Sequence, residues 1–141
     1  MTKLILTDEL SASFDQLKEQ SEHAIWNKDF TRGTKLLEQC WNLLPDPKIA
    51  YSESYHAAHA LAEAYLQMGD LENAGRWSEI LFDCALHRID SGEKDFLAGK
   101  IAFEKKELES AKEHFNIANE KSDSRCFEGE DEKYWLFLLK K

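Results

Sequence analysis

The chain has 141 residues, of which 43% are apolar and 32% charged, a composition typical of one folded domain. Eighteen basic residues against 27 acidic ones leave a formal net charge of −9, which opposes binding to nucleic-acid phosphates and to anionic membrane surfaces. No apolar run approaches the roughly 20 residues of a membrane span, and the N-terminus lacks the pattern of a signal peptide. The sequence therefore predicts a cytoplasmic protein that binds neither nucleic acid nor membranes.

The first predicted helical hairpin covers about residues 13–44 and follows an extended lead-in. Ser11 or Ser13 is expected to cap its first helix, because serine side chains accept hydrogen bonds from free backbone amides. The turn falls at residues 27–29. Pro45 is expected to stop the second helix, because proline has no amide hydrogen to donate.

The second predicted hairpin covers about residues 48–88 and has the clearest pattern. Its first helix is expected over residues 48–68, with small apolar residues at helical spacing that let another helix come close. Gly69 favours the left-handed conformation that ends a helix, and Asp70 is expected to cap the next one. That second helix is predicted to end near His87.

The third predicted hairpin covers about residues 92–121, with Ser91 as its expected cap. A stretch rich in turn-forming residues then leads to a final helix at about residues 131–141. Acidic residues at its start and lysines at its end suit the helix dipole, and residues 135–139 are all large and apolar. We interpret it as a helix that covers the exposed apolar end of a repeat array, with docking of a partner as the alternative.

Three sets of residues resemble the tetratricopeptide repeat, a helix-turn-helix unit of about 34 residues. The matching residues are Leu61, Ala62, Tyr65, Gly69, Asp70 and Ala74 in the second hairpin, Gly99, Ala102, Leu108, Ala111, Phe115 and Ala118 in the third, and Phe30, Gly33, Leu37, Cys40 and Pro45 in the first. Aligning Gly33, Ala74 and Ala111 gives steps of 41 and 37 residues (74 − 33 and 111 − 74), so the loops between hairpins should be longer than usual.

The resemblance implies an all-α fold. Three tetratricopeptide-like (TPR-like) hairpins would form a right-handed α-α superhelix with a C-terminal capping helix, as a single helical-repeat domain over residues 1–141. In such an array the first helices line a concave groove, which is the expected surface for a partner. Its charged, histidine and aromatic side chains suit a protein-binding hot spot. They are Lys18, Glu22, His56, His59, Glu63, Phe96, Lys100 and Phe103.

No motif for a nucleophile, a phosphate loop or a metal site is present, so no catalytic residue, cofactor or metal is predicted. His56, His59 and Glu63 lie on one face of a helix, which suits either a divalent metal or an acid-base pair. We favour their role as a polar wall of the groove. Cys40 and Cys84 belong to no metal-binding or redox pair and are expected to be small apolar fillers.

The main functional hypothesis is a non-enzymatic module that binds one specific, basic protein. Small, acidic, stand-alone TPR-like proteins resemble the immunity proteins of bacterial polymorphic toxin systems and of contact-dependent growth inhibition. That resemblance implies an immunity protein that neutralises a cognate toxin domain. A TPR adaptor or a chaperone for another protein is one alternative. A metal-dependent sensor or enzyme that uses His56, His59 and Glu63 is the other.

Overall fold

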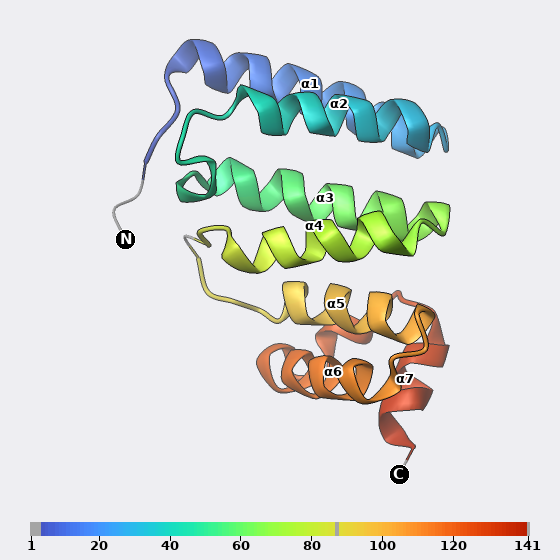
Figure 1. Cartoon of the computed structure of the whole chain (residues 1–141). Helices are drawn as coiled ribbons and strands as arrows, with labels where there is room; N and C mark the ends of the chain where they lie inside the picture. The colour runs from blue at the N-terminus through green and yellow to red at the C-terminus, as the bar shows by residue number, and fades with distance from the viewer. Residues whose placement is uncertain (1–3, 87, 141) are drawn as a thin grey trace. The chain divides into compact units, whose positions relative to one another are not determined.

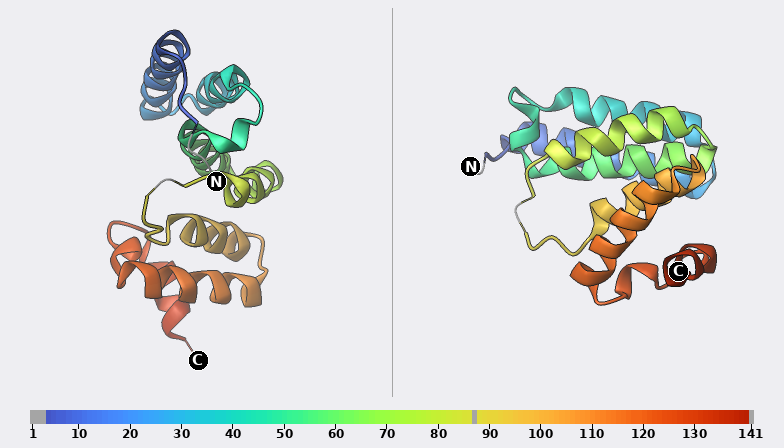
Figure 2. Two further views of the ribbon diagram at one scale, coloured as in Figure 1. Left: turned by 90° about the vertical axis from the view of Figure 1, so that its left-hand side faces the viewer. Right: turned by 60° about the horizontal axis from the view of Figure 1, so that its bottom comes forward.

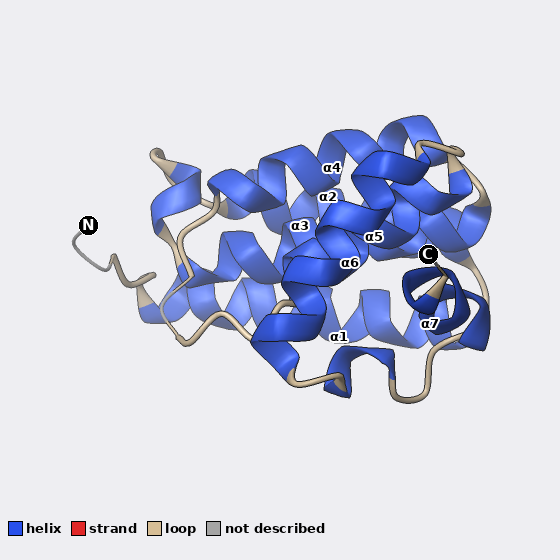
Figure 3. Ribbon diagram, turned by 90° about the horizontal axis from the view of Figure 1, so that it is seen from below, coloured by secondary structure: helices blue, strands red, loops and turns tan. Residues whose placement is uncertain are grey.

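The computed structural model describes residues 4–86 and 88–140. Within them the chain forms seven α-helices and two short 3-10 helices, and the only strand-like pairing is a single bridge between Leu4 and Tyr51 (Figure 1, Figure 3). The prediction of an all-α protein is therefore confirmed. The helices divide into two compact units, Met1–His87 (unit 1) and Arg88–Lys141 (unit 2).

Unit 1 contains two helical hairpins (Figure 2). In the first, α1 pairs with α2, and in the second, α3 pairs with α4, while α2 also packs against α3. The bounds of these elements are α1 Asp8–Trp26, α2 Phe30–Leu43, η1 Lys48–Ala50, α3 Ser52–Met68 and α4 Leu71–Asp83.

Unit 2 contains the third hairpin and the C-terminal helix. The helix α5 pairs with α6, and the 3-10 helix η2 and the helix α7 both pack against α6. Tyr134 and Leu138 of α7 are buried in one apolar cluster with Phe115 of α6, so α7 closes the core of this unit. The bounds of these elements are α5 Glu93–Glu104, α6 Leu108–Ser122, η2 Arg125–Phe127 and α7 Glu132–Leu139.

All three hairpins turn in the same way. After each first helix comes a residue with left-handed backbone, in the order Lys28 (φ 62°), Gly69 (80°) and Lys106 (67°). The residue that follows it donates its backbone N–H to the carbonyl oxygen five positions earlier, at 2.8 to 2.9 Å, which is the Schellman pattern of a helix C-terminus. These turns are 41 and 37 residues apart (69 − 28 and 106 − 69), the same steps that the sequence alignment predicts.

A small residue lies five positions after the left-handed residue of each turn. These residues are Gly33, Ala74 and Ala111, and all three are buried. A Cβ atom on Gly33 would lie 2.6 Å from Cγ1 of Ile25 on the facing helix, closer than carbon atoms can approach. In unit 2 the same restriction applies to Gly99 of α5, which faces the ring of Phe115. The missing side chains of Gly33 and Gly99 therefore allow the close approach of α1 to α2 and of α5 to α6.

Two predicted helix starts are wrong. The helix α1 begins at Asp8 rather than near residue 13, and Thr7 caps it by accepting the Leu10 N–H at 3.2 Å, so neither Ser11 nor Ser13 is the cap. The helix α3 begins at Ser52 rather than at residue 48. Residues 48–50 form the separate 3-10 helix η1, and the extended residue after it pairs with the lead-in segment.

Two further expectations concern the connection between the units. The helix α4 ends at Asp83, and its predicted end near His87 lies outside the described residues. Ser91 does not cap α5: Gly92 precedes that helix with a φ of 91°, and the carboxylate of Asp90 accepts the Gly92 N–H at 2.9 Å.

The right-handed superhelix and the single repeat domain stay predictions. Across the described ranges, no helix combines the length and the apolar composition that crossing a membrane requires.

Replacing Gly99 with alanine should destabilise unit 2. The new methyl group would lie 2.6 and 2.7 Å from two ring carbons of Phe115, which is fully buried and cannot move aside. We expect a loss of about 1–3 kcal/mol in the free energy of unfolding, reduced by the better helix propensity of alanine, about 1 kcal/mol. Denaturant unfolding followed by circular dichroism measures it. A Gly99→Ala, Phe115→Leu double variant should lose less than the two single variants combined, and additive losses would contradict the clash.

Acid should loosen the attachment of α7 through Glu104 of α5. Its carboxylate accepts hydrogen bonds from Lys133 at 2.8 Å and from the Tyr134 hydroxyl at 2.9 Å. The Lys133 hydrogen bond lowers the pKa of Glu104, opposed by burial and assisted by Tyr134. Because the folded pKa lies below the unfolded value of about 4.3, this contribution to stability is present above that value and is lost as the pH falls through the folded pKa.

The measurement is the free energy of unfolding at about pH 7 and about pH 3. Wild-type protein should lose more stability between these values than Glu104→Gln, which has no carboxylate to protonate. Glu120→Gln, which changes an exposed glutamate of α6, is the matched control and should behave as wild type. Equal losses in wild type and Glu104→Gln would show that the carboxylate does not hold α7.

Candidate functional site: a groove along α1 and α3

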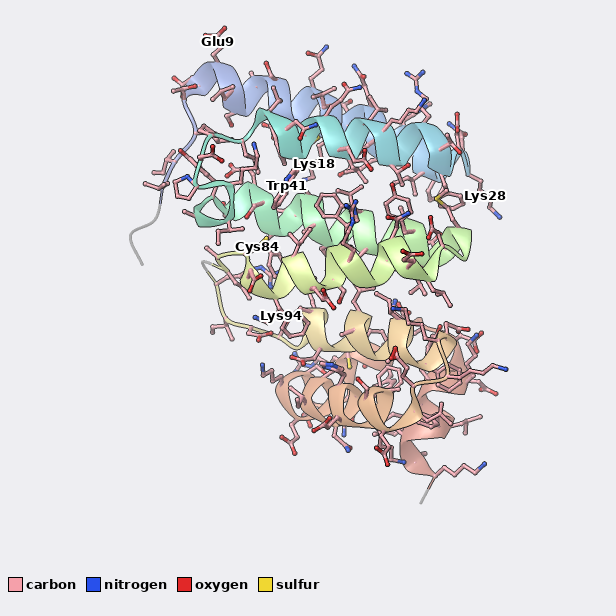
Figure 4. All side chains as sticks on the ribbon, in the orientation of Figure 1. Glu9, Lys18, Lys28, Trp41, Cys84 and Lys94 are labelled. Atoms are coloured by element: carbon pink, nitrogen blue, oxygen red, sulfur yellow. The ribbon has the colours of Figure 1, made fainter. Side chains whose placement is uncertain are left out.

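The first helices of the two hairpins in unit 1 enclose a narrow pocket of about 50 Å³. Its floor is apolar and belongs to the core of unit 1, while its rim carries charged and histidine side chains. Figure 4 labels Lys18, which extends from α1 into this region beside α3. The lining residues are Phe14, Lys18, Ser21, Glu22, Ile25, Leu37, Cys40, His56, Ala57 and Ala60.

A second hollow of about 540 Å³ lies beside the pocket, on the side of the hairpin turns. Glu22 and Ile25 line both spaces, so the two are neighbours, and together we name them the α1–α3 groove. The lining residues of the second hollow are Glu22, Ile25, Trp26, Lys28, Phe30 and Gln67.

The helical repeat places the groove residues of α1 in one row. Phe14, Lys18, Ser21 and Ile25 recur at steps of three and four, which brings them to the same side of the helix. Ser21 is completely buried, and its hydroxyl donates to the Lys18 carbonyl oxygen at 2.6 Å, so burial leaves this polar group satisfied. This row of α1 therefore forms an apolar floor with a charged edge.

The opposite wall comes from α3. His56, Ala60, Glu63 and Gln67 follow one another at steps of three and four along this helix. Ala60 has only a methyl group, which leaves open space beside the α1 row. The α3 wall therefore consists of polar side chains with open space beside Ala60 between them.

The charges on the groove rim are weakly held. Lys18 and Glu22 approach to 3.9 Å, but their side chains stay 43% and 65% exposed. Exposed pairs of this kind contribute about 1 kcal/mol or less, so a partner can replace the pair at little cost. Burial raises the pKa of the Cys40 thiol to about 11, although nearby Lys18 acts in the opposite direction. Cys40 therefore stays protonated near neutral pH and serves as an apolar filler, not a nucleophile.

Five of the eight predicted groove residues belong to unit 1. Lys18, Glu22 and His56 line the same pocket. Glu63 lies on the same row of α3, between Ala60 and Gln67, which line the two parts of the groove. His59 is half-buried, and its ring stacks on that of Tyr55 with centroids 6.2 Å apart. Their expected role in binding stays a prediction.

The three predicted residues in unit 2 have a different environment. Phe96 is 6% exposed, and its ring contacts those of Phe115, Phe127 and Tyr134, so the expectation that it is a surface anchor is wrong. The η2 segment and α7 cover the side of α5 on which it lies. This burial results from contacts between residues about 30 positions apart, which helical periodicity cannot predict.

Lys100 and Phe103 also face the C-terminal segment. The Lys100 ammonium pairs with Glu130 at 3.0 Å and is 5% exposed as a residue, so it is a structural ion pair rather than an open groove group. Phe103 is half-buried and packs edge-on against Tyr134 and Phe137 of α7. The eight predicted groove residues are therefore divided between the two units, five in unit 1 and three in unit 2.

Trp26 is the groove residue that sequence reasoning missed. It is the last residue of α1, it lines the second hollow, and it is 86% exposed. The sequence could have indicated this exposure, because Trp26 lies outside the apolar row of α1 and a side chain outside that row does not pack into the core. An exposed tryptophan beside a charged rim is a typical protein-binding anchor.

The net negative charge is concentrated in unit 1, because unit 2 has more basic residues. Residues 1–87 contain fourteen acidic and seven basic side chains, a formal charge of −7. Residues 88–141 contain thirteen acidic and eleven basic ones, a formal charge of −2. The unit that carries the α1–α3 groove therefore supplies most of the negative field of the protein.

The chemistry needed for a metal site is not assembled in the part of the chain that the structure describes. Among those residues, no group of three or more His, Cys, Asp or Glu side chains is placed to hold a metal ion.

A buried carboxylate in unit 2 has a structural role. The side chain of Asp95 is 95% buried and lies 3.0 Å from His114 and 3.6 Å from Lys121. These pairs tie the start of α5 to α6.

Comparison of the chain with protein-family models, with curated proteins and with solved structures gave no match.

Trp26 should dominate the solvent-accessible fluorescence of the protein. Trp77 is buried, and Trp41 and Trp135 are half-buried. We expect Trp26→Phe to remove most of the emission that acrylamide quenches, with the stability changed by no more than about 0.5 kcal/mol, as for other exposed positions. Trp77→Phe is the control: it should keep the quenchable emission. Strong quenching that persists in Trp26→Phe would contradict the exposure of this side chain.

Proposed function

We propose that this chain is a binding module that holds one specific protein partner in the α1–α3 groove. The observation that supports this is the combination of a narrow apolar floor, the weakly paired rim of Lys18 and Glu22, and the exposed Trp26 at one end. Hot spots of protein interfaces combine an aromatic anchor with a pocket and a surrounding polar rim. The groove offers all three within one unit.

The partner in this proposal is a basic protein. The formal charge of −7 on unit 1 attracts a positively charged surface before contact and thereby raises the association rate. The rim itself carries both signs, so it selects a partner by matched pairs rather than by net charge alone. His56 adds a donor or acceptor at the same edge.

Within this class, we propose toxin immunity as the specific role. A compact, acidic protein can inhibit a basic toxin domain by covering its active site. The sequence resembles small, acidic TPR-like immunity proteins, which have this role. An adaptor or a chaperone would use the same groove for a different partner. An immunity protein binds one folded toxin domain and abolishes its activity, whereas a chaperone favours unfolded clients.

No observation favours the metal-dependent sensor or enzyme. His56, His59 and Glu63 do not form a candidate metal-binding group among the described residues. We therefore propose these three as part of the polar environment of the groove.

The test is a search of the neighbouring genes for a toxin domain, followed by calorimetry of its binding to this protein. Trp26→Ala, and separately Lys18→Ala combined with His56→Ala, should each weaken binding by about 2 kcal/mol or more, because they remove the anchor and the rim. Their melting temperatures should stay within the range of surface substitutions. Higher salt should slow association more than it speeds dissociation, because the attraction between net charges acts before contact.

Glu19→Ala is the matched control for Glu22→Ala, since both are exposed glutamates of α1 and Glu19 lines a hollow between α1 and α2 instead. Only Glu22→Ala should weaken binding. Wild-type affinity in every groove variant would exclude the groove as the binding site. Full binding without inhibition of the toxin would exclude immunity and leave the adaptor or the chaperone.

A further inference from the structure

One face of the C-terminal helix α7 is apolar and exposed. Tyr134 and Leu138 point into the core of unit 2, while Glu132, Leu136 and Leu139 lie at steps of four and three on another side. Leu136 is 56% and Leu139 58% exposed. Two neighbouring leucines on a helix of eight residues, both more than half exposed, have an unfavourable contact with water that a partner surface would remove.

Opposite charges stand at the two ends of this face. Glu132 is the first residue of α7, and Lys140 directly follows its last residue. Both side chains are exposed. Each charge also matches its helix end, since the N-terminus of a helix favours acids and the C-terminus bases. Lys133, next to Glu132, is paired with Glu104 at 2.8 Å. With that lysine neutralised by its partner, the face runs from negative through apolar to positive along the helix axis.

A hollow lies beside the apolar part of the face. It has a volume of about 790 Å³, and its apolar lining includes Phe103, Leu108, Leu136 and Phe137. The Lys112 ammonium donates to the carbonyl oxygens of Phe137 and Lys140, which fixes the end of α7 at the edge of the hollow. The surface thus offers both a ridge, formed by Leu139, and a space next to it.

We propose that two copies of this chain associate through α7, with the two α7 helices packed antiparallel about a twofold axis. This arrangement places Leu136 of both copies at the axis. It places Glu132 of each copy opposite Lys140 of the other, so the same ion pair forms twice. Leu139 of each copy lies toward the hollow of the other.

A second copy fits this surface because the surface is complementary to itself. In a twofold interface each patch meets its own image, so a patch that is negative at one end and positive at the other pairs with itself when reversed. Antiparallel packing also brings opposite ends of the two helix dipoles together. Unit 2 has a formal charge of only −2, so repulsion between two copies is far smaller there than it would be through unit 1.

The interface is small, which sets the strength of the association. A helix of eight residues is roughly 12 Å long, and interfaces below about 1,200 Å² are typical of weak, transient complexes. The dimer should therefore form reversibly as the protein concentration rises.

Sedimentation velocity of the full chain from about 1 μM to about 1 mM covers the dissociation constants expected of such an interface. The wild-type mass should rise reversibly from monomer to dimer. Leu136→Asp should raise the dissociation constant about tenfold or more, because it removes the central contact and sets two carboxylates against each other. Ile89→Asp changes another exposed apolar residue of unit 2, 89% exposed, and should leave association unchanged.

Exchange of the end charges tests the antiparallel arrangement. Glu132→Lys alone gives a copy with lysine at both ends of the face, and Lys140→Glu alone gives one with glutamate at both ends, so each should self-associate more weakly than wild type. A mixture of the two variants should form mixed dimers, because every end charge then meets its opposite. Glu120→Lys controls for the change in net charge and should associate as wild type.

A wild-type protein that remains monomeric over the whole range would overturn the proposal. So would unchanged association of Leu136→Asp. Because Leu136 is more than half exposed, we expect that variant to keep the fold of unit 2, so its result can be used even where a charge variant frays α7. Absence of mixed dimers between two folded charge variants would overturn the antiparallel arrangement. Self-association of Glu132→Lys alone that is as strong as that of wild type would do so as well.

Discussion

Every hairpin of this chain depends on one backbone arrangement, in which a left-handed residue is followed by an acid that returns its N–H to the last turn of the helix. Gly69 adopts this conformation easily, but at Lys28 and Lys106 it costs roughly 1–2 kcal/mol. The Schellman hydrogen bonds and the packing of the paired helices must exceed that cost. Four positions after the acid comes a small, buried residue of the second helix, which is Gly33, Ala74 or Ala111.

The consequences differ between the two units. In unit 1 the paired faces leave a groove between α1 and α3, because alanines and a buried serine occupy the inner rows. In unit 2, η2 and α7 cover the aromatic side chains of α5 and α6. The aromatic residues of α5 that were expected to line a groove therefore pack in the core of this unit or against α7. The charge follows the same division, with unit 1 strongly acidic and unit 2 close to neutral.

The two proposed interactions therefore use different chemistry. The α1–α3 groove offers a charged rim and a tryptophan to a partner of opposite charge. The face of α7 offers an apolar ridge with balanced end charges to its own copy. Because one surface lies in unit 1 and the other in unit 2, the substitutions that test one leave the residues of the other unchanged.

The sequence by itself determined the helices, their turns and the repeat steps, because helix periodicity, the Gly69-Asp70 turn and Pro45 act through residues a few positions apart. Lys18, Glu22 and His56, which the sequence predicted for one groove, line the same pocket of unit 1, and their role in binding stays a prediction. Only the tertiary structure decided that Phe96 is buried, that Lys100 pairs with Glu130, and that Trp26 is exposed. A helical pattern defines the apolar face of a segment, but which distant segment covers that face depends on contacts between residues that the local pattern does not relate.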